Sequence, residues 1–462
     1  MQGQDRFNRF IERYPHSHPF PVTRAHATRR EFFQVLGAGF TGSFLAGRVR
    51  AGEVISQASV QTQNRAKNVI FILLAGGPTH VDLFDLKVIN GVTPATFNPT
   101  SINGIDWPVG LMPKLAQHLP DLAIVRSVKS WALQHQLGQV WTQIGRNPAA
   151  ALGDIAPNIG SVVAAEKERE RLPGQVFPTF LALNSGGAVG SGYLPAIHSP
   201  LKIDVAAAGL PDTSNPDGPA RLDTRIALLN TLDGVNRVKS QYARTMEDYD
   251  GFYKAARGLC YNPAVDAAFR FTTAESATYG NSGFGNACLT AAKATAANLG
   301  TRFILITSGG WDDHQNIYAA NALPARSAQL DNGLSQLIAD LKASGRFTET
   351  LIVMMGEFGR TVGPLTGQGG RDHFLQQFVL FAGGGVRGGR AIGATSATGS
   401  TTSEAGWSRD RDVRVEDIEA TIYSALGINW TTTRYDDPFG RGFDYVPFSK
   451  DDLYGPINEL WA

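Results

Sequence analysis

Histidine and carboxylate side chains recur directly after apolar segments of this sequence. Three of the nine histidines lie before residue 30. Four of the other six follow an apolar run or come shortly after one, and three of these four have a carboxylate beside them. Imidazole and carboxylate groups bind zinc, manganese and iron and also transfer protons in enzymes. The candidate metal ligands and acid–base residues are therefore His80, Asp82, His135, Asp312, His314, Glu357, Asp372 and His373.

Two arginines accompany these residues. Arg360 follows Glu357 in "GEFGRT", and Arg371 precedes Asp372 in "GGRDHF". A guanidinium group can bind the oxygen atoms of an oxyanion bidentately. Taken singly, each candidate has a structural alternative, because Asp or His can cap a helix or turn and neighbouring opposite charges can form a local salt bridge. Their shared position after several apolar runs favours one metal or acid–base site.

The apolar runs have the character of strands that are buried on both faces of a parallel sheet. An amphipathic helix, predicted over 330–346, separates two of them and so indicates a βαβ unit; a second helix is predicted over 415–428. We therefore expect a doubly wound, mostly parallel α/β sheet with helices on both faces and ligands at the carboxyl ends of its strands. The predicted strands are "NVIFILL" from residue 68, then 122–128, 179–185, 302–308, 350–356 and the run from residue 377.

The overall composition sets broad limits on function. The chain has 462 residues, with 42 Lys and Arg against 41 Asp and Glu, and this balance does not indicate a nucleic-acid-binding protein. No apolar run reaches the roughly 18 residues of a transmembrane helix. Cys260 and Cys288 lack the spacing of a metal site and are interpreted as small apolar residues, although export would favour a disulfide.

The amino-terminal segment is similar to a twin-arginine export signal. "TRREFFQ" (28–34) contains the arginine pair, and the glycine-rich, weakly apolar "VLGAGFTGSFLAG" (35–47) follows it. We expect residues 1–50 to be signal and leader, 51–66 a linker, and 67–462 one α/β domain with a helical insertion around 186–300. The expected location is the periplasm or cell envelope, reached through the twin-arginine export machinery, which carries folded proteins.

Four motifs together resemble a known family. "GGPTHVDLFD", "GGWDDHQN", "MGEFGRT" and "GRDHF", in this order behind a twin-arginine leader, are similar to the domain-of-unknown-function family numbered fifteen hundred and one, grouped with alkaline phosphatases and sulfatases. The resemblance implies their fold, with one or two divalent metals at the strand ends. It implies metal binding by Asp312, His314, Glu357 and His373, with Asp82 as the first-strand ligand, His80 as a further one and Asp372 beside His373.

The sequence departs from that superfamily in two places. Phe358 stands where a histidine ligand is expected, and the nucleophile signature of the sulfatases does not occur. In that superfamily the nucleophile lies about ten residues before a glycine, and the residue ten positions before Gly145 is His135. Either His135 is a ligand or acid–base group and water is the nucleophile, or Ser130 is the nucleophile. Arg360 or Arg371 would then hold the oxyanion.

These observations predict an exported metal-dependent hydrolase of phosphate or sulfate esters. Its substrate would be a small anionic ester, and its metal zinc, manganese, calcium or magnesium. The alternative is a non-catalytic member that binds an anionic ligand or serves in envelope structure and assembly. The missing histidine ligand and the missing nucleophile support this alternative.

Replacing Arg29 and Arg30 by lysine tests the export signal. We expect the double variant to accumulate in the cytoplasm, since the arginine pair is what the twin-arginine route recognises. Cell fractionation followed by immunoblotting measures this distribution. Export of the double variant at the wild-type level would show that the signal was assigned wrongly.

Overall fold

The computed structural model describes residues 55–56, 59–150, 152–214, 216–238 and 243–462. The predicted leader, residues 1–50, lies outside the described residues. Part of the predicted linker is described: β1 (Ile55–Ser56) pairs antiparallel with β16 (Thr433–Arg434), which also pairs with β17 (Phe443–Asp444). In the described part of the chain, no helix is both long and apolar enough to span a bilayer.

The molecule is organised around one sheet of eight strands. Each of the six predicted strands is present in it. Only β12 runs antiparallel to its neighbours, so the sheet is mostly parallel, as the sequence predicts. The order across the sheet is β13 (Arg390–Ile392), β5 (Leu122–Lys129), β12 (Gln376–Gly383), β9 (Thr350–Gly356), β2 (Asn68–Leu74), β8 (Phe303–Ser308), β6 (Phe180–Leu183) and β7 (Leu201–Ile203).

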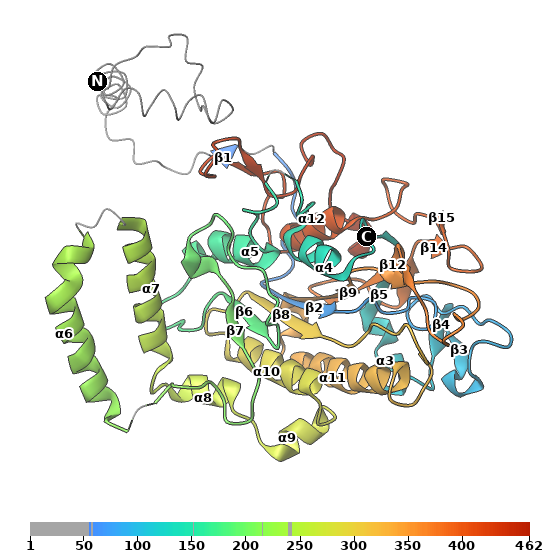
Figure 1. Cartoon of the computed structure of the whole chain (residues 1–462), viewed down its shortest axis with the longest axis horizontal. Coiled ribbons are helices and arrows are strands. Elements are labelled where there is room, and N and C mark those ends of the chain that lie inside the picture. The colour runs from blue at the N-terminus through green and yellow to red at the C-terminus, as the bar shows by residue number, and fades with distance from the viewer. Residues whose placement is uncertain (1–54, 57–58, 151, 215, 239–242) are drawn as a thin grey trace, which may run out of the picture. The chain divides into compact units, whose positions relative to one another are not determined.

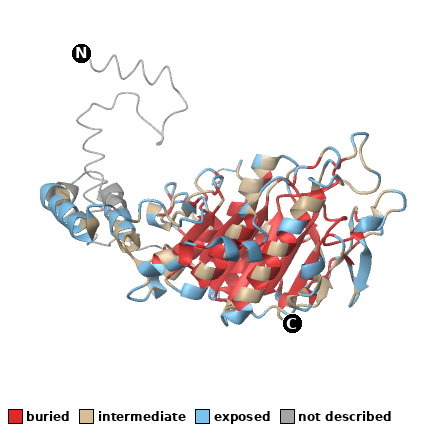
Figure 2. Cartoon of the chain, turned by 90° about the horizontal axis from the view of Figure 1, so that it is seen from below, coloured by how far each residue is buried: buried red, intermediate tan, exposed pale blue. Residues whose placement is uncertain are grey.

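Both faces of the sheet are covered by helices (Figure 1). Alternate residues of β2 enter two separate cores: Ile70 and Ile72 pack on one face, and Phe71 and Leu73 on the other. The strands are accordingly buried along the centre of the molecule (Figure 2). The first face is covered by α10 (Gly283–Ala297) and α11 (Leu323–Ala343), and the second by α5 (Ile159–Lys167) and α12 (Val415–Ala425).

Further helices lie between β7 and β8, and shorter elements connect the rest of the chain. The long α6 packs on α7, and many of its described side chains are exposed to solvent. These helices are α6 (Gly218–Val238), α7 (Ala243–Leu259), α8 (Pro263–Phe269) and α9 (Thr273–Thr278). The connecting elements include β3 (Pro99–Ile102), β4 (Ile105–Pro108), α3 (Pro113–Ala116), α4 (His135–Ile144), β10 (Gly359–Arg360), β11 (His373–Phe374), β14 (Ala394–Thr395) and β15 (Thr402–Glu404).

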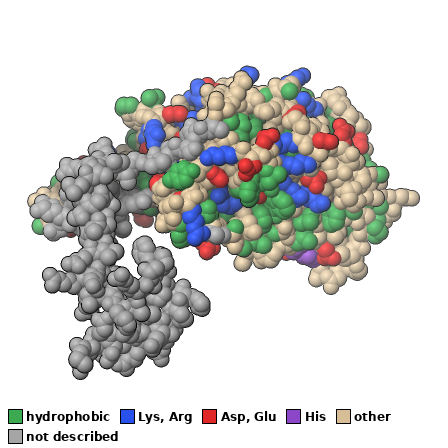
Figure 3. Space-filling view, turned by 90° about the horizontal axis from the view of Figure 1, so that it is seen from above, with side chains coloured by type: hydrophobic (Ala, Val, Ile, Leu, Met, Phe, Trp, Pro, Cys, Tyr) green, Lys and Arg blue, Asp and Glu red, His purple; other side chains and the backbone are tan. Residues whose placement is uncertain are grey.

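The surface charge is mixed, and the two cysteines are not bonded to each other. Basic and acidic side chains are intermixed on the face drawn in Figure 3, in keeping with a formal net charge of +1. Cys260 and Cys288 are both free cysteines, and Cys288 is fully buried. Burial raises the pKa of the Cys288 thiol, so it behaves as an apolar core residue.

Glycine at position 160 lets α5 approach the sheet closely. A Cβ atom added to Gly160 would lie 2.5 Å from the ring of Phe303 and 2.8 Å from that of Phe180. We expect Gly160→Ala to lower the free energy of unfolding by about 1–3 kcal/mol, the usual cost of overpacking. In Gly234→Ala of α6, the added methyl meets no atom within 4 Å, and alanine favours the helix. Urea unfolding measures both; an equal loss in the two variants would contradict the packing argument.

Candidate metal centre

Four predicted site residues meet at the carboxyl edge of the sheet. Asp312 and His314 follow the end of β8, and His373 begins β11. His135 is the first residue of α4, whose start is capped by the side chain of Gln134 accepting a hydrogen bond from the Leu137 N–H. These segments come from distant parts of the sequence and are brought together by the order of the strands.

The metal-binding atoms of His135, Asp312, His314 and His373 all lie within 4.8 Å of one another. The Oδ1 atom of Asp312 lies 3.2 Å from Nε2 of His135, 3.0 Å from Nε2 of His314 and 3.7 Å from Nε2 of His373. The two Nε2 atoms of His314 and His373 are 3.0 Å apart. Three imidazole nitrogens and one carboxylate oxygen therefore share one small volume.

The opposite nitrogen of each imidazole is held by an oxygen atom. Nδ1 of His135 donates to Glu357 at 2.7 Å, Nδ1 of His314 to Asp372 at 2.9 Å, and Nδ1 of His373 to the Leu133 carbonyl at 2.6 Å. Carbonyl and ionised carboxylate oxygens only accept hydrogen bonds, so each Nδ1 carries the proton. The three Nε2 atoms consequently turn lone pairs inward.

This arrangement fits a divalent cation. Inward lone pairs and a carboxylate oxygen repel one another, and Nε2 of His135 is buried without a hydrogen-bond partner among the described residues. A cation bound between them would remove the repulsion and satisfy all four atoms. Nitrogen and oxygen ligands of this kind suit zinc and related transition metals, and oxygen acceptors behind ligating imidazoles are a regular feature of such centres.

The electrostatic surroundings favour the metal-binding forms of two ligands. Desolvation opposes ionisation of Asp312, but the hydrogen bond and the positive charge of Arg360 hold the pKa of its carboxyl below the usual value. Desolvation lowers the pKa of His373, and the positive charge of Arg360 lowers it further. A carboxylate and a neutral imidazole are the forms that bind metal.

Glu357 lies behind His135 rather than among the four converging residues. It is buried and accepts hydrogen bonds from the Gly76 N–H at 2.9 Å and from Nε2 of Gln139 at 3.1 Å, in addition to that from His135. Gln139 and the Gly76 amide were not predicted as site groups. Only the spacing of Gln139, four residues after His135 on one face of α4, could have indicated it.

Two predicted metal ligands, His80 and Asp82, lie apart from the four. Both side chains are fully buried. Asp82 forms an ion pair with Arg371, whose Nε lies 2.8 Å from Oδ2 of Asp82, and it accepts further hydrogen bonds from Thr79 and Tyr318. Nε2 of His80 bonds to the Gly399 carbonyl at 2.9 Å. Of the eight candidate metal ligands and acid–base residues named from the sequence, four therefore meet in one small volume.

The two arginines expected to hold an oxyanion donate their hydrogen bonds to groups of the protein itself. Arg371 is fully buried, and beyond Asp82 it donates to the carbonyls of Thr361 and Gly363. Removing one partner of such a buried ion pair lowers the stability of the fold by about 3–5 kcal/mol. The Asp82–Arg371 pair therefore contributes to holding the fold together. Arg360 is 1% exposed and donates to Asp312 at 2.5 Å and to carbonyls of the neighbouring loops.

Phe358 and Ser130, where the sequence departs from the sulfatase pattern, also have defined places. The ring of Phe358 packs on the imidazoles of His135 and His373, with centroids 4.8 and 4.6 Å apart. Phe358 thus packs against two of the four converging residues, from the position where the sequence comparison expected a histidine. Ser130 is buried, and its Oγ accepts a hydrogen bond from Nε2 of Gln377 at 2.6 Å.

Comparison with solved structures finds similarity to a sulfatase, a phosphonate monoester hydrolase and a lipoteichoic acid synthase. The similar structures include the PsFucS1 sulfatase from Pseudoalteromonas sp. (15% identity, TM-score 0.38, 87% of this chain and 72% of that one). The phosphonate monoester hydrolase SpPMH from Silicibacter pomeroyi (12%, 0.35, 83% and 76%) and the lipoteichoic acid synthase LtaP from Listeria monocytogenes (11%, 0.36, 85% and 79%) are also similar. These TM-scores are below 0.5, so the similarity does not indicate what this chain binds.

A family model decides the membership that the four motifs indicated. No curated protein matches the chain. The model described as "Protein of unknown function (DUF1501)" matches residues 66–446, which include all four motifs and the four converging residues. This chain belongs to the DUF1501 family.

Proposed function

We propose that this protein is a metal-dependent hydrolase of phosphate or sulfate esters, with the divalent cation held by His135, Asp312, His314 and His373. One observation carries the proposal: three inward Nε2 atoms and a carboxylate oxygen meet within 4.8 Å, and an oxygen acceptor holds the other nitrogen of each imidazole. A divalent cation supplies Lewis-acid activation of the ester and of an attacking water.

The accessibility of the four residues favours a catalytic centre over a purely structural one. The side chains of Asp312 and His314 are 47% and 39% exposed, so a small ester can reach these two residues. Structural metal sites are usually closed, whereas catalytic sites keep a position open for water or substrate. The more buried side, formed by Glu357 and Phe358, holds the imidazoles in place.

The charges around the centre support binding of one divalent cation. With the imidazoles neutral, Asp312, Glu357 and Asp372 contribute three negative charges, and Arg360 contributes one positive charge. Two negative charges therefore remain, which a divalent cation balances. In the same centre, Arg360 and Asp372 act as positioning residues: they bond to Asp312 and to His314.

Water is the proposed nucleophile. Ser130 is buried and bonded to Gln377, and no Ser, Thr or Cys side chain forms a hydrogen bond to the four ligands within the described ranges of the chain. The side chains of Asp312 and His314 are partly exposed, so water can reach this side of the proposed centre. We further propose export to the periplasm or envelope on the strength of residues 28–34, which would carry the folded, metal-loaded protein across the membrane.

Metal content tests the centre directly. His314→Ala and His373→Ala each remove a ligand atom and are expected to lose most of the bound metal. Glu357→Gln keeps the ligands but weakens the orientation of His135, so metal affinity should fall about 10–100-fold. Mass spectrometry of the purified variants measures metal stoichiometry, and circular dichroism confirms folding. His198→Ala is the matched control, because His198 lies outside the converging residues. Full occupancy in both ligand variants would rule out the proposed centre.

Turnover of simple esters tests the reaction. The metal-loaded protein is expected to hydrolyse 4-nitrophenyl phosphate or 4-nitrophenyl sulfate, to lose activity with a chelator and to regain it when metal is restored, because the cation activates both ester and water. Release of 4-nitrophenol is followed by absorbance, with His314→Ala as the inactive control and His198→Ala as the active one. Metal-loaded protein that hydrolyses neither ester, nor other phosphate and sulfate monoesters, would favour the non-catalytic alternative.

A further inference from the structure

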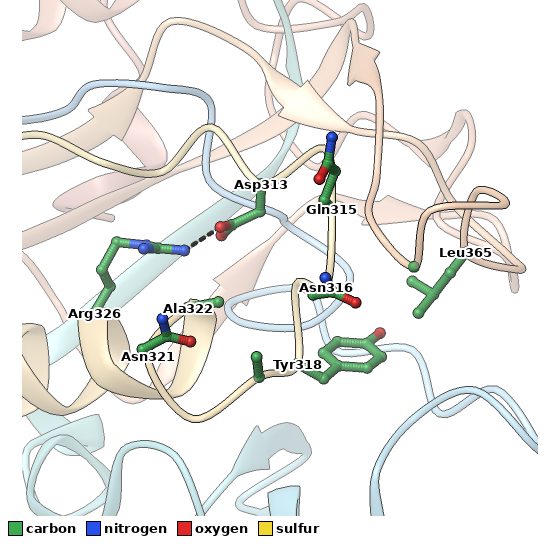
Figure 4. Close-up of a pocket in the computed structure, with 10 residues that line it drawn as sticks. Asp313, Gln315, Asn316, Tyr318, Asn321, Ala322, Arg326 and Leu365 are labelled. Carbon is green, nitrogen blue, oxygen red and sulfur yellow. Dashed lines mark hydrogen bonds and ion pairs between the residues drawn. The ribbon is translucent and has the colours of Figure 1, made fainter.

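A second recess lies beside the metal centre and is not used by the proposed reaction. It has a volume of about 750 Å³ and is bounded by the chain after β8, the start of α11 and the loop near Leu365 (Figure 4). Ligand pockets in proteins commonly measure about 300–1,000 Å³. The recess is therefore large enough for a small organic molecule or part of a larger one.

The recess and the metal centre share one segment of chain but use different side chains. Asp313 lines the recess, whereas its neighbours Asp312 and His314 belong to the metal centre. Asp313 is ion-paired with Arg326, in the first turn of α11, and Figure 4 shows the two side chains facing each other across the recess wall. A molecule bound in the recess would therefore contact a residue that lies between two residues of the proposed metal centre in the sequence.

The residues that line the recess include one acidic and one basic side chain, so their net charge is zero. Asp313 and Arg326 are the only charged residues among those that form it, and their charges offset each other. A phosphate or sulfate in the recess would meet the Asp313 carboxylate as well as the guanidinium. The charge balance favours an uncharged ligand with hydrogen-bonding groups.

The other polar groups of the lining match hydroxyl groups. Gln315, Asn316 and Asn321 are exposed amides, each able both to donate and to accept. Tyr318 also lines the recess, but its hydroxyl is engaged elsewhere: it donates to Asp82 at 2.8 Å and accepts from Arg371 at 3.0 Å. Tyr318 therefore contributes its apolar ring, not its hydroxyl. Amides and an ion pair around an aromatic ring suit a molecule with both hydroxyls and a C–H face.

We propose that this recess binds an uncharged polyhydroxylated ligand, namely a sugar ring. The ion pair would accept from and donate to neighbouring hydroxyl groups, the amides would bond to the others, and the Tyr318 ring would pack against C–H groups. This site goes beyond the proposed hydrolase and does not depend on it, because none of its residues is a metal ligand.

Binding of neutral oligosaccharides tests the site. The probes are sulfate-free tetrasaccharides of glucose, galactose, mannose and fucose, titrated into the full metal-loaded protein by calorimetry. At least one is expected to bind, and Gln315→Ala and Asn321→Ala should each weaken it about 3- to 10-fold, the effect of losing an ordinary hydrogen bond. No hydrogen bond of the described structure depends on either amide side chain, so both variants should fold. Gln117→Ala removes an exposed amide outside the recess and should bind as wild type does.

The outcomes separate this proposal from the hydrolase. Both recess variants should keep full metal content, whereas His314→Ala should lose metal. Failure of every tetrasaccharide to bind would overturn the sugar site, and so would binding that is unchanged in Gln315→Ala and Asn321→Ala. Titration with inorganic phosphate and sulfate provides a further arm. Anion binding that these two variants weaken, without sugar binding, would show that the recess takes an anion instead.

Discussion

One buried guanidinium group, that of Arg360, connects the loops that build the proposed metal centre. It donates to the carbonyls of Gly76 and Gly77 after β2, to the carbonyl of Trp311 after β8, and to the carbonyl of Arg371 before β11. It also binds Asp312 itself. A buried cation is costly unless its donors are satisfied, so the loops can hold this group only in an arrangement that presents their carbonyl oxygens to it. The position of Asp312 depends on this arrangement.

The central sheet makes the arrangement rigid. Strands β2, β8 and β9 lie side by side in parallel, so their carboxyl ends emerge at one edge. Their side chains are packed on both faces and can move little. The polar loops that follow therefore start from fixed positions. Glu357, at the end of β9, adds a second connection, because it accepts from the Gly76 amide and from His135. The loop after β2 is thus held by the Glu357 carboxylate as well as by the Arg360 guanidinium.

The same edge contains two kinds of polar environment with different consequences. Around Asp82 the donors and acceptors match, and Arg371, Thr79 and Tyr318 satisfy the carboxylate within the protein. Around Asp312 three imidazole nitrogens turn lone pairs toward the same oxygen, and protein donors do not satisfy them all. An excess of acceptors in a partly exposed pocket is the condition under which a cation binds, because it stabilises every group at once.

The sequence alone determined the layout of the fold and the region of the site. Long apolar runs predicted strands buried on both faces, because strand burial and periodicity depend on local residue pattern. Two of the four motifs contain Asp312, His314 and His373, and His135 follows the predicted strand over 122–128. The tertiary structure decided which carboxylates and arginines belong to the centre. Asp82 follows its strand just as Asp312 does, yet it meets Arg371, some 290 positions away. Side-chain direction and long-range partners depend on how strands and loops pack in three dimensions, and the spacing of residues along the chain does not record them.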